Sequence, residues 1–283
     1  MTINECLKQI ISKLNENNLE DSNIIARKLL EHTLNQNRQY IVVNGNKNLT
    51  CLQINQIEEN TQKIIDGKPI QYITHEQAFM NEKYYVDENV LIPQPDTEIL
   101  AYEALKICES LESIKLLDLC TGSGAIAISI EKALANKKHE IFASDISDSA
   151  LVVANKNKEK NNANVTFIKS NLLENINEND FDVIVSNPPY IETKVIENLS
   201  KQVKNEPMLA LDGGEDGLDF YRKIIENGYK YIKNNGYLCL EIGYKQAKSV
   251  CVLLEQEKVY KHIKVIKDLN QNDRCVICKI VKE

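Results

Sequence analysis

The sequence contains no apolar run approaching the roughly 20 residues that a bilayer-spanning helix requires. Its eight cysteines among 283 residues are too sparse for a disulfide-stabilised scaffold. Residues 1–15 form a charged amphipathic stretch that lacks the apolar segment of a secretory signal. We therefore expect a reduced, cytoplasmic protein that does not associate with membranes.

An excess of basic charge is also missing. The chain has 34 Lys and Arg against 41 Asp and Glu, a net charge of −7, and no segment concentrates basic residues. Proteins that bind a phosphate backbone usually present a basic surface, so a DNA partner is disfavoured. The four histidines show no metal-ligand spacing, and Cys275 and Cys278 lie three apart on a strand-like segment, which directs them to opposite faces. We expect no metal site.

The pattern of apolar residues changes near residue 67. Before this point they recur at helical spacing, which predicts a small helical domain over 1–66. Residues 67–98 resemble a β connector with extended segments at 71–74 and 84–86, stiffened by two prolines. From 99 to 283, strand-like and helix-like segments alternate.

This alternation predicts an α/β domain with a mostly parallel sheet covered by helices on both faces. The last two strands are joined by a link too short for a crossover helix, so we expect the final strand to be antiparallel. Ligands of such sheets bind beyond the carboxyl ends of the parallel strands. The expected strands are 115–119, 140–145, 165–170, 181–186, 236–242, 262–267 and 274–281, and the expected helices include 96–109, 149–161, 218–233 and 245–256.

A glycine-rich loop, DLCTGSGAIA, follows the first of these strands at 118–127. Gly122 and Gly124 permit a sharp turn and a close approach of a ligand to the backbone, and we expect a side chain at Gly124 to enter the ligand space. Asp145 ends the next strand, where its carboxylate can accept both hydroxyl hydrogens of a ribose. This pattern fits both nicotinamide cofactors and S-adenosyl-L-methionine.

The tetrapeptide Asn-Pro-Pro-Tyr at 187–190 ends the fourth strand. Its two prolines have no N–H and fix the backbone, which leaves the Asn187 side-chain oxygen and the Pro188 carbonyl as rigid acceptors. Two such acceptors orient an NH2 group, and the Tyr190 ring can lie beside it. This arrangement suits alkylation of a planar amide or amino nitrogen, because the acceptors stabilise the positive charge that develops there.

Several functions share these features. An adenine-N6 nucleic-acid methyltransferase solves the same chemical problem, although flipping a base out of a duplex requires phosphate contacts. A nicotinamide-dependent oxidoreductase explains the glycine loop and Asp145 but gives Asn-Pro-Pro-Tyr no role. A non-enzymatic binding module would be expected to lose a glycine, Asp145 or Asn187, and all are present.

The motifs taken together resemble the HemK/PrmC family, whose members have a Rossmann-like S-adenosylmethionine-dependent methyltransferase domain. The resemblance implies methyl transfer to the glutamine side-chain nitrogen of the Gly-Gly-Gln motif in class-I peptide chain release factors, a step of translation termination. We expect the helical domain 1–66 to dock that partner and the chain to act as a monomer. The matching motifs are GKPIQYI (67–73), VLIPQPDTE (90–98), DLCTGSGAIAI (118–128), SNPPYI (186–191), NEPMLALDGGEDGL (205–218) and KDLNQNDR (267–274).

The same resemblance implies roles for individual residues. Catalysis would rest on Asn187, Pro188 and Tyr190, which together with Pro189 would hold the acceptor glutamine. Several positions depart from the family pattern, among them Cys120, which replaces a glycine, Asn171, which replaces an aspartate, and Gln94, which replaces an arginine. The residues expected to bind the cofactor are Cys120, Thr121, Gly122, Ser123, Gly124, Asp145, Asn171, Leu172 and Asn187.

Overall fold

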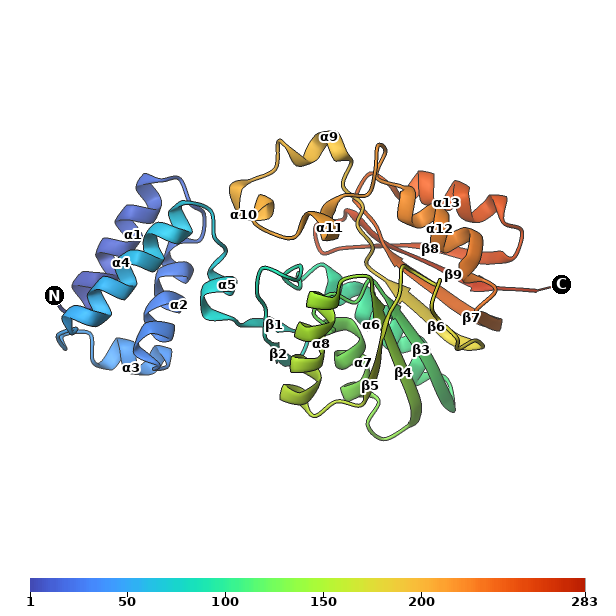
Figure 1. Cartoon of the computed structure of the whole chain (residues 1–283), viewed down its shortest axis with the longest axis horizontal. Helices are drawn as coiled ribbons and strands as arrows, with labels where there is room; N and C mark the ends of the chain where they lie inside the picture. The colour runs from blue at the N-terminus through green and yellow to red at the C-terminus, as the bar shows by residue number, and fades with distance from the viewer. Residues whose placement is uncertain (283) are drawn as a thin grey trace. The chain divides into compact units, whose positions relative to one another are not determined.

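The computed structural model describes residues 1–282, which divide into two compact units (Figure 1). The helical unit comprises Met1–Glu76 together with Ser200–Asn205. The sheet unit comprises Gln77–Leu199 and the residues from Glu206 onward. No helix within residues 1–282 is both long and apolar enough to cross a membrane.

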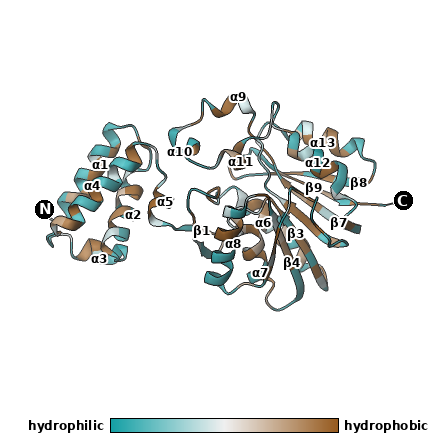
Figure 2. Cartoon of the chain, viewed as in Figure 1, coloured by the Kyte–Doolittle hydropathy of each residue, from teal (hydrophilic) through white to brown (hydrophobic). Residues whose placement is uncertain are grey.

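The helical unit is built around its own apolar core. Threonines begin two of its helices with capping boxes, in which Thr2 pairs with Glu5 and Thr50 with Gln53. Along the long helices apolar and hydrophilic residues alternate, and the apolar ones supply the core (Figure 2). The helices of this unit are α1 (Ile3–Glu16), α2 (Ser22–Leu34), α3 (Arg38–Val43), α4 (Cys51–Ile65), α5 (Ile70–Thr74) and α10 (Lys201–Lys204).

One expected extended segment is helical instead. Residues 71–74 belong to α5, because Ile70 and Ile73, three apart, both pack into the core of the helical unit. Gly67, with a φ of +106°, turns the chain between α4 and α5, and both helices still pack into the same core. The compact helical unit consequently runs to Glu76 rather than to residue 66. The β structure of the connector is limited to a hairpin of β1 (Gln77–Phe79) and β2 (Glu82–Tyr84) in the sheet unit.

The sheet unit contains a seven-stranded sheet of order β5-β4-β3-β6-β7-β9-β8. The five strands from β5 to β7 in this order are parallel, and β9 is antiparallel to both of its neighbours, which confirms the predicted antiparallel end of the chain. The strands are β3 (Ser113–Leu119), β4 (Lys138–Asp145), β5 (Val165–Lys169), β6 (Phe181–Ser186), β7 (Ile232–Glu241), β8 (Tyr260–Lys267) and β9 (Asp273–Ile280).

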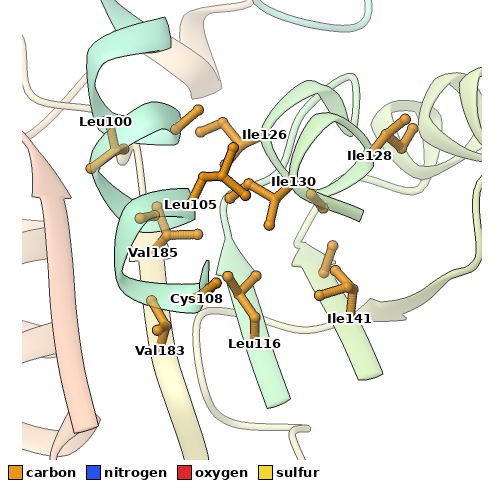
Figure 3. Close-up of a cluster of buried hydrophobic side chains, with 14 of the residues drawn as sticks. Leu100, Leu105, Cys108, Leu116, Ile126, Ile128, Ile130, Ile141, Val183 and Val185 are labelled. Carbon is orange, nitrogen blue, oxygen red and sulfur yellow. The ribbon is translucent and has the colours of Figure 1, made fainter. Parts of the chain in front are cut away.

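Helices cover the sheet on both faces, as predicted. On one face, Leu100 and Cys108 of α6 and Ile130 of α7 pack with strand residues such as Leu116 and Val183 (Figure 3). Residues of α12 and α13 form a second core with the alternate positions of the same strands. The helices are α6 (Thr97–Glu109), α7 (Ala125–Ala133), α8 (Asp148–Asn161), α9 (Thr193–Ile196), α11 (Met208–Leu211), α12 (Asp219–Gly228) and α13 (Ala247–Gln256).

The two cysteines of the Cys-x-x-Cys pattern belong to these opposite faces. Cys275 is part of the core beneath α6 and α7, and Cys278 is part of the core beneath α12 and α13. The side-chain alternation of β9 therefore separates the thiols, as the sequence predicts.

The helix expected over 218–233 is shorter than predicted. It ends at Gly228, and β7 already begins at Ile232, which pairs with Phe181 of β6. Ile232 is fully buried at this pairing, and the register shifts before Tyr237 pairs with Val183. Burial of Ile232 in the sheet decides its structure, whereas the following Asn-Asn-Gly sequence suggested that the strand began later.

Asn157 of α8 is a fully buried polar residue that ties two loops of the sheet unit together. Its Oδ1 accepts a hydrogen bond from the backbone N–H of Tyr85 at 2.6 Å, and its Nδ2 donates to the Tyr85 carbonyl at 2.9 Å. The same Nδ2 donates to the carbonyl of Ser123, in the glycine loop, at 2.9 Å. The glycine loop is thereby fixed to the segment that follows the β hairpin.

We predict that Asn157→Ala lowers the free energy of unfolding of the sheet unit by about 2–4 kcal/mol, because buried backbone groups lose their partners. Asn155→Ala is the matched control, since Asn155 lies on the same helix and is exposed, and its amide bonds only to the Leu151 carbonyl. Urea denaturation followed by circular dichroism measures both changes. Equal effects of the two substitutions would contradict the assigned role.

Candidate functional site

A cavity of about 360 Å³ opens at the carboxyl ends of the parallel strands of the sheet unit. The loops after β3, β4, β5 and β6 all contribute to it, as expected for a parallel sheet. Residues 88–91 and 207–210 also line it. Of the residues proposed from sequence, those that line the cavity are Cys120, Gly122, Asp145, Asn171, Leu172, Asn187 and Pro189.

The glycine loop presents its backbone to this cavity at Gly122. A Cβ on Gly122 would meet no atom within 4 Å, and the residue adopts a φ of +54°. Asp118, at the end of β3, is completely buried and accepts a hydrogen bond from the Thr121 hydroxyl at 2.6 Å. Burial raises the pKa of Asp118 to about 7, while the Thr121 hydrogen bond lowers it. Thr121 therefore holds the loop from inside.

Gly124 has a different role from the one expected. A Cβ on this residue would lie 3.1 Å from Ile128 Cδ1 and 3.1 Å from Phe167 Cζ, so a side chain would enter the packed interior rather than the ligand space. Gly124 also has a φ of +81° and N-caps α7. The close packing of α7 against its neighbours, and not the ligand, requires glycine here.

Cys120 lies at a left-handed backbone position, with a φ of +60°. This conformation favours glycine, which explains why glycine is usual there in the family that the sequence resembles. The side chain lines the cavity, and burial raises the pKa of its thiol well above the ordinary range, with the nearby Asp145 and Asp118 carboxylates adding to the shift. The thiol therefore contributes shape and apolar surface to the cavity as a neutral group.

Asp145 links the ends of β3 and β4. Its Oδ2 accepts a hydrogen bond from the Gly122 N–H at 2.8 Å, and its Oδ1 accepts one from the Ser147 N–H at 3.0 Å. Burial raises the pKa of Asp145, and these backbone hydrogen bonds oppose the shift. A carboxylate has about four acceptor positions, so Asp145 keeps capacity for a ligand hydroxyl group beside its backbone partners.

The loop after β5 supplies Asn171 and Leu172. Leu172 is 8% exposed and has a φ of +51°, and it places an apolar side chain at the wall of the cavity. The Asn171 amide nitrogen donates to Glu174 Oε1 at 2.7 Å. The Asn171 side-chain amide thus already forms a hydrogen bond within its own loop.

Asn187 lines the cavity directly after β6. Its Nδ2 donates a hydrogen bond to the Thr97 hydroxyl oxygen at 3.2 Å. Its Oδ1 accepts no hydrogen bond within residues 1–282 and remains an open acceptor. Pro188 is buried and does not line the cavity, whereas Pro189 does.

Tyr190, Thr121 and Ser123 were also predicted to belong to the site, but they do not line the cavity. The Tyr190 ring packs against the core beneath α12 and α13, and its hydroxyl lies 3.4 Å from Glu241 Oε1. Burial raises the pKa of the Tyr190 hydroxyl, and the Glu241 carboxylate raises it further. Thr121 and Ser123 support the glycine loop from the interior.

A second glycine-rich segment holds the Asn-Pro-Pro-Tyr loop in place. The Gly213 N–H donates to the Ile191 carbonyl at 2.8 Å, and a Cβ on Gly213 would lie 2.7 Å from Tyr190 Cα. The Gln246 side chain donates to the Tyr190 carbonyl at 2.9 Å. Sequence reasoning missed the roles of Gly213 and Gln246, although Gly213 lies within the quoted NEPMLALDGGEDGL motif.

We predict that Gly213→Ala displaces the Asn-Pro-Pro-Tyr loop and lowers the unfolding free energy by about 1–3 kcal/mol, because the new methyl group overlaps backbone atoms. Gly228→Ala serves as the control, since a Cβ there would approach no atom closer than 3.7 Å. Thermal unfolding of the two variants provides the comparison. A Gly213→Ala protein as stable as Gly228→Ala would show that the loop does not need this glycine.

Two family models match the chain. The model described as the PrmC N-terminal domain matches residues 5–74, and the model described as the methyltransferase small domain matches residues 97–214. Among solved structures, a methyltransferase from Pyrococcus furiosus superposes with a TM-score of 0.54 at 20% identity, covering 80% of this chain and 100% of that chain. This likeness supports the predicted Rossmann-like fold of the sheet unit.

Curated relatives match along almost the whole sequence. The release factor glutamine methyltransferase of Bacillus anthracis is 37% identical over 286 residues, covering 99% of this chain and 100% of that protein. The protein of the same name from Thermodesulfovibrio yellowstonii is 38% identical over 275 residues, covering 96% of this chain and 95% of that protein. On this full-length similarity, the chain belongs to the family of release factor glutamine methyltransferases.

Proposed function

We propose that this chain transfers a methyl group from S-adenosyl-L-methionine to the side-chain amide nitrogen of the glutamine in the Gly-Gly-Gln motif of class-I peptide chain release factors. The observation that carries the proposal is the open Asn187 Oδ1 at a cavity that also contains the glycine loop and Asp145. Membership of the family supplies the reaction and the kind of substrate.

The cavity fits the cofactor. Gly122 leaves open space above the backbone, and Asp145 lines the cavity with acceptor capacity for a ribose hydroxyl group. Ile146 and Leu172 offer apolar surfaces that suit an adenine ring. When bound, S-adenosyl-L-methionine supplies an activated methyl group.

The Asn-Pro-Pro-Tyr loop suits the acceptor amide. An amide nitrogen is a poor nucleophile, because its lone pair is delocalised into the carbonyl group. Asn187 Oδ1, at the cavity, would accept one N–H of the glutamine and would bind more strongly as the nitrogen becomes positive. The Pro188 carbonyl is the second acceptor that the sequence predicts, although Pro188 does not line the cavity. No ionised base is required, because the nitrogen loses its proton readily after it has gained the methyl group.

We further propose that the helical unit positions the protein substrate. A glutamine side chain makes few contacts by itself, so most of the energy that orients it must come from surfaces remote from the reacting atoms. The acidic chain, with its net charge of −7, suits a protein partner better than DNA. We propose that the enzyme acts as a cytoplasmic monomer. Neither an adenine-N6 methyltransferase nor a nicotinamide oxidoreductase receives support from the relatives.

For the cofactor site, we predict that Asp145→Ala weakens binding of S-adenosyl-L-methionine by about 1–3 kcal/mol, because charge-assisted hydrogen bonds to the ribose are lost. Asp148→Ala is the control, since this aspartate is exposed, pairs with Lys169 and does not line the cavity. Isothermal titration calorimetry gives both affinities. An unchanged affinity in Asp145→Ala would remove Asp145 from the cofactor site.

For the reaction, we predict that the purified protein adds one methyl group to the Gly-Gly-Gln glutamine of an intact release factor, detected by mass spectrometry with labelled S-adenosyl-L-methionine. Asn187→Ala should lower this methylation by about 100-fold or more, because it removes an acceptor of the substrate amide. Its cofactor affinity, measured by calorimetry, should remain close to that of the unaltered protein.

Asn155→Ala, an exposed substitution in the same unit, should retain activity. A methyl group on any other residue, or full activity in Asn187→Ala, would contradict the proposed chemistry. If the helical unit docks the substrate, a short Gly-Gly-Gln peptide should be a poorer substrate than the intact release factor.

A further inference from the structure

Asn187 belongs to a cluster of polar side chains in which Thr97 and Glu241 are buried and have no role in the proposed reaction so far. Thr97 begins α6, Glu241 ends β7 and Arg274 lies on β9, so three distant segments meet at the loop after β6. Thr97 is 5% exposed and Glu241 only 2%. We call the following residues of the sheet unit the Asn187 cluster: Asp96, Thr97, Asn187, Tyr190, Glu241 and Arg274.

The hydroxyl of Thr97 faces two members of this cluster. Its oxygen accepts the hydrogen bond from Asn187 Nδ2 at 3.2 Å. The Thr97 side chain also lies near the Glu241 carboxyl and lowers the pKa of Glu241, although no hydrogen bond joins the two side chains within residues 1–282. A hydroxyl has one hydrogen and two lone pairs, so Thr97 can accept from Asn187 while its hydrogen turns toward Glu241.

The Glu241 carboxyl is an acceptor in this direction. When it is ionised, it accepts hydrogen bonds and donates none, so it favours a Thr97 hydrogen that points toward it. Glu241 Oε2 has no hydrogen-bond partner within residues 1–282, so this oxygen has unused acceptor capacity. The Tyr190 hydroxyl donates to the other oxygen, Oε1, at 3.4 Å.

Arg274 favours the ionised form of this carboxylate. Burial raises the pKa of Glu241 to about 7, a rise that the nearby Thr97 side chain and the positive charge of Arg274 limit and the charge of Asp96 increases. Asp96 and Asp268 hold the Arg274 guanidinium, each at 3.0 Å. The cluster therefore places a fixed cation near the buried Glu241 carboxyl, and the Thr97 hydroxyl lies near this carboxyl while it accepts from Asn187.

We propose that Thr97 is a positioning residue that fixes which way the Asn187 side-chain amide faces. With Nδ2 held by Thr97, Oδ1 is the atom left for the cavity, where the glutamine NH2 needs an acceptor. If the amide turned by 180°, it would present its own NH2 to the substrate NH2, and two donors would face each other. This inference rests on the proposed function, and it assigns a role to the threonine of the VLIPQPDTE motif.

The test is Thr97→Val, which keeps the shape of the side chain and removes the hydroxyl. Asn187 Nδ2 then loses its buried acceptor, and the amide gains by turning toward the cavity. We expect kcat for a release factor to fall by roughly 5- to 150-fold, the range that corresponds to losing a buried hydrogen-bond partner. The affinity for S-adenosyl-L-methionine, measured by calorimetry, should change by less than about 2-fold, because Thr97 does not line the cavity.

Two further variants separate positioning from stability. Thr97→Ser retains the hydroxyl and should restore kcat to within about 3-fold of the unaltered enzyme. Tyr84→Phe breaks another buried side-chain hydrogen bond of the same unit, between the Tyr84 and Ser129 hydroxyl groups at 2.6 Å, and should leave kcat unchanged even where thermal stability falls.

The proposal is overturned if Thr97→Val keeps full kcat, if Thr97→Ser is as slow as Thr97→Val, or if Tyr84→Phe loses as much activity. Failure of the unaltered enzyme to methylate any release factor would instead refute the proposed function itself. The two failures are therefore distinguishable in one set of assays.

Discussion

The loop after β6 contains two consecutive prolines, so it cannot fix its own shape with backbone N–H donors and depends on groups from other segments. Gln246 holds the Tyr190 carbonyl, and the Gly213 N–H holds the Ile191 carbonyl. The Thr97 hydroxyl oxygen accepts a hydrogen bond from the Asn187 side-chain amide. The prolines leave free acceptors for a substrate, and the surrounding segments supply the rigidity that makes those acceptors useful.

The sheet brings this loop to the proposed cofactor site. β3 lies between β4 and β6, and all three are parallel, so Gly122, Asp145 and Asn187 emerge at one edge. The hydrogen bond from the Gly122 N–H to Asp145 joins the first two loops directly. A cofactor held by the β3 and β4 loops would therefore face an acceptor group held by the β6 loop across the same cavity.

The sequence was most informative where chemistry and structure are local. The alternation of strands and helices of an α/β domain, the loop at Gly122 and the tetrapeptide at Asn187 could all be found from local patterns in the sequence. Thr97 could not be given a role, because its contact with Asn187 spans 90 positions of the chain and leaves no periodic signal. Gly124 was assigned to the ligand because spacing alone cannot distinguish a backbone that faces a cavity from one that faces a packed core. The helix α5 was missed because its core contacts, rather than its own five residues, decide its structure.

The most direct test of this account is a crystal structure of the protein with S-adenosylhomocysteine and a Gly-Gly-Gln peptide. We predict that the glutamine Nε2 lies within hydrogen-bond distance of Asn187 Oδ1 and the Pro188 carbonyl, with Asn187 Nδ2 still bonded to Thr97. The account would be contradicted if the glutamine amide were held by other groups, or if Asn187 pointed away from the glutamine.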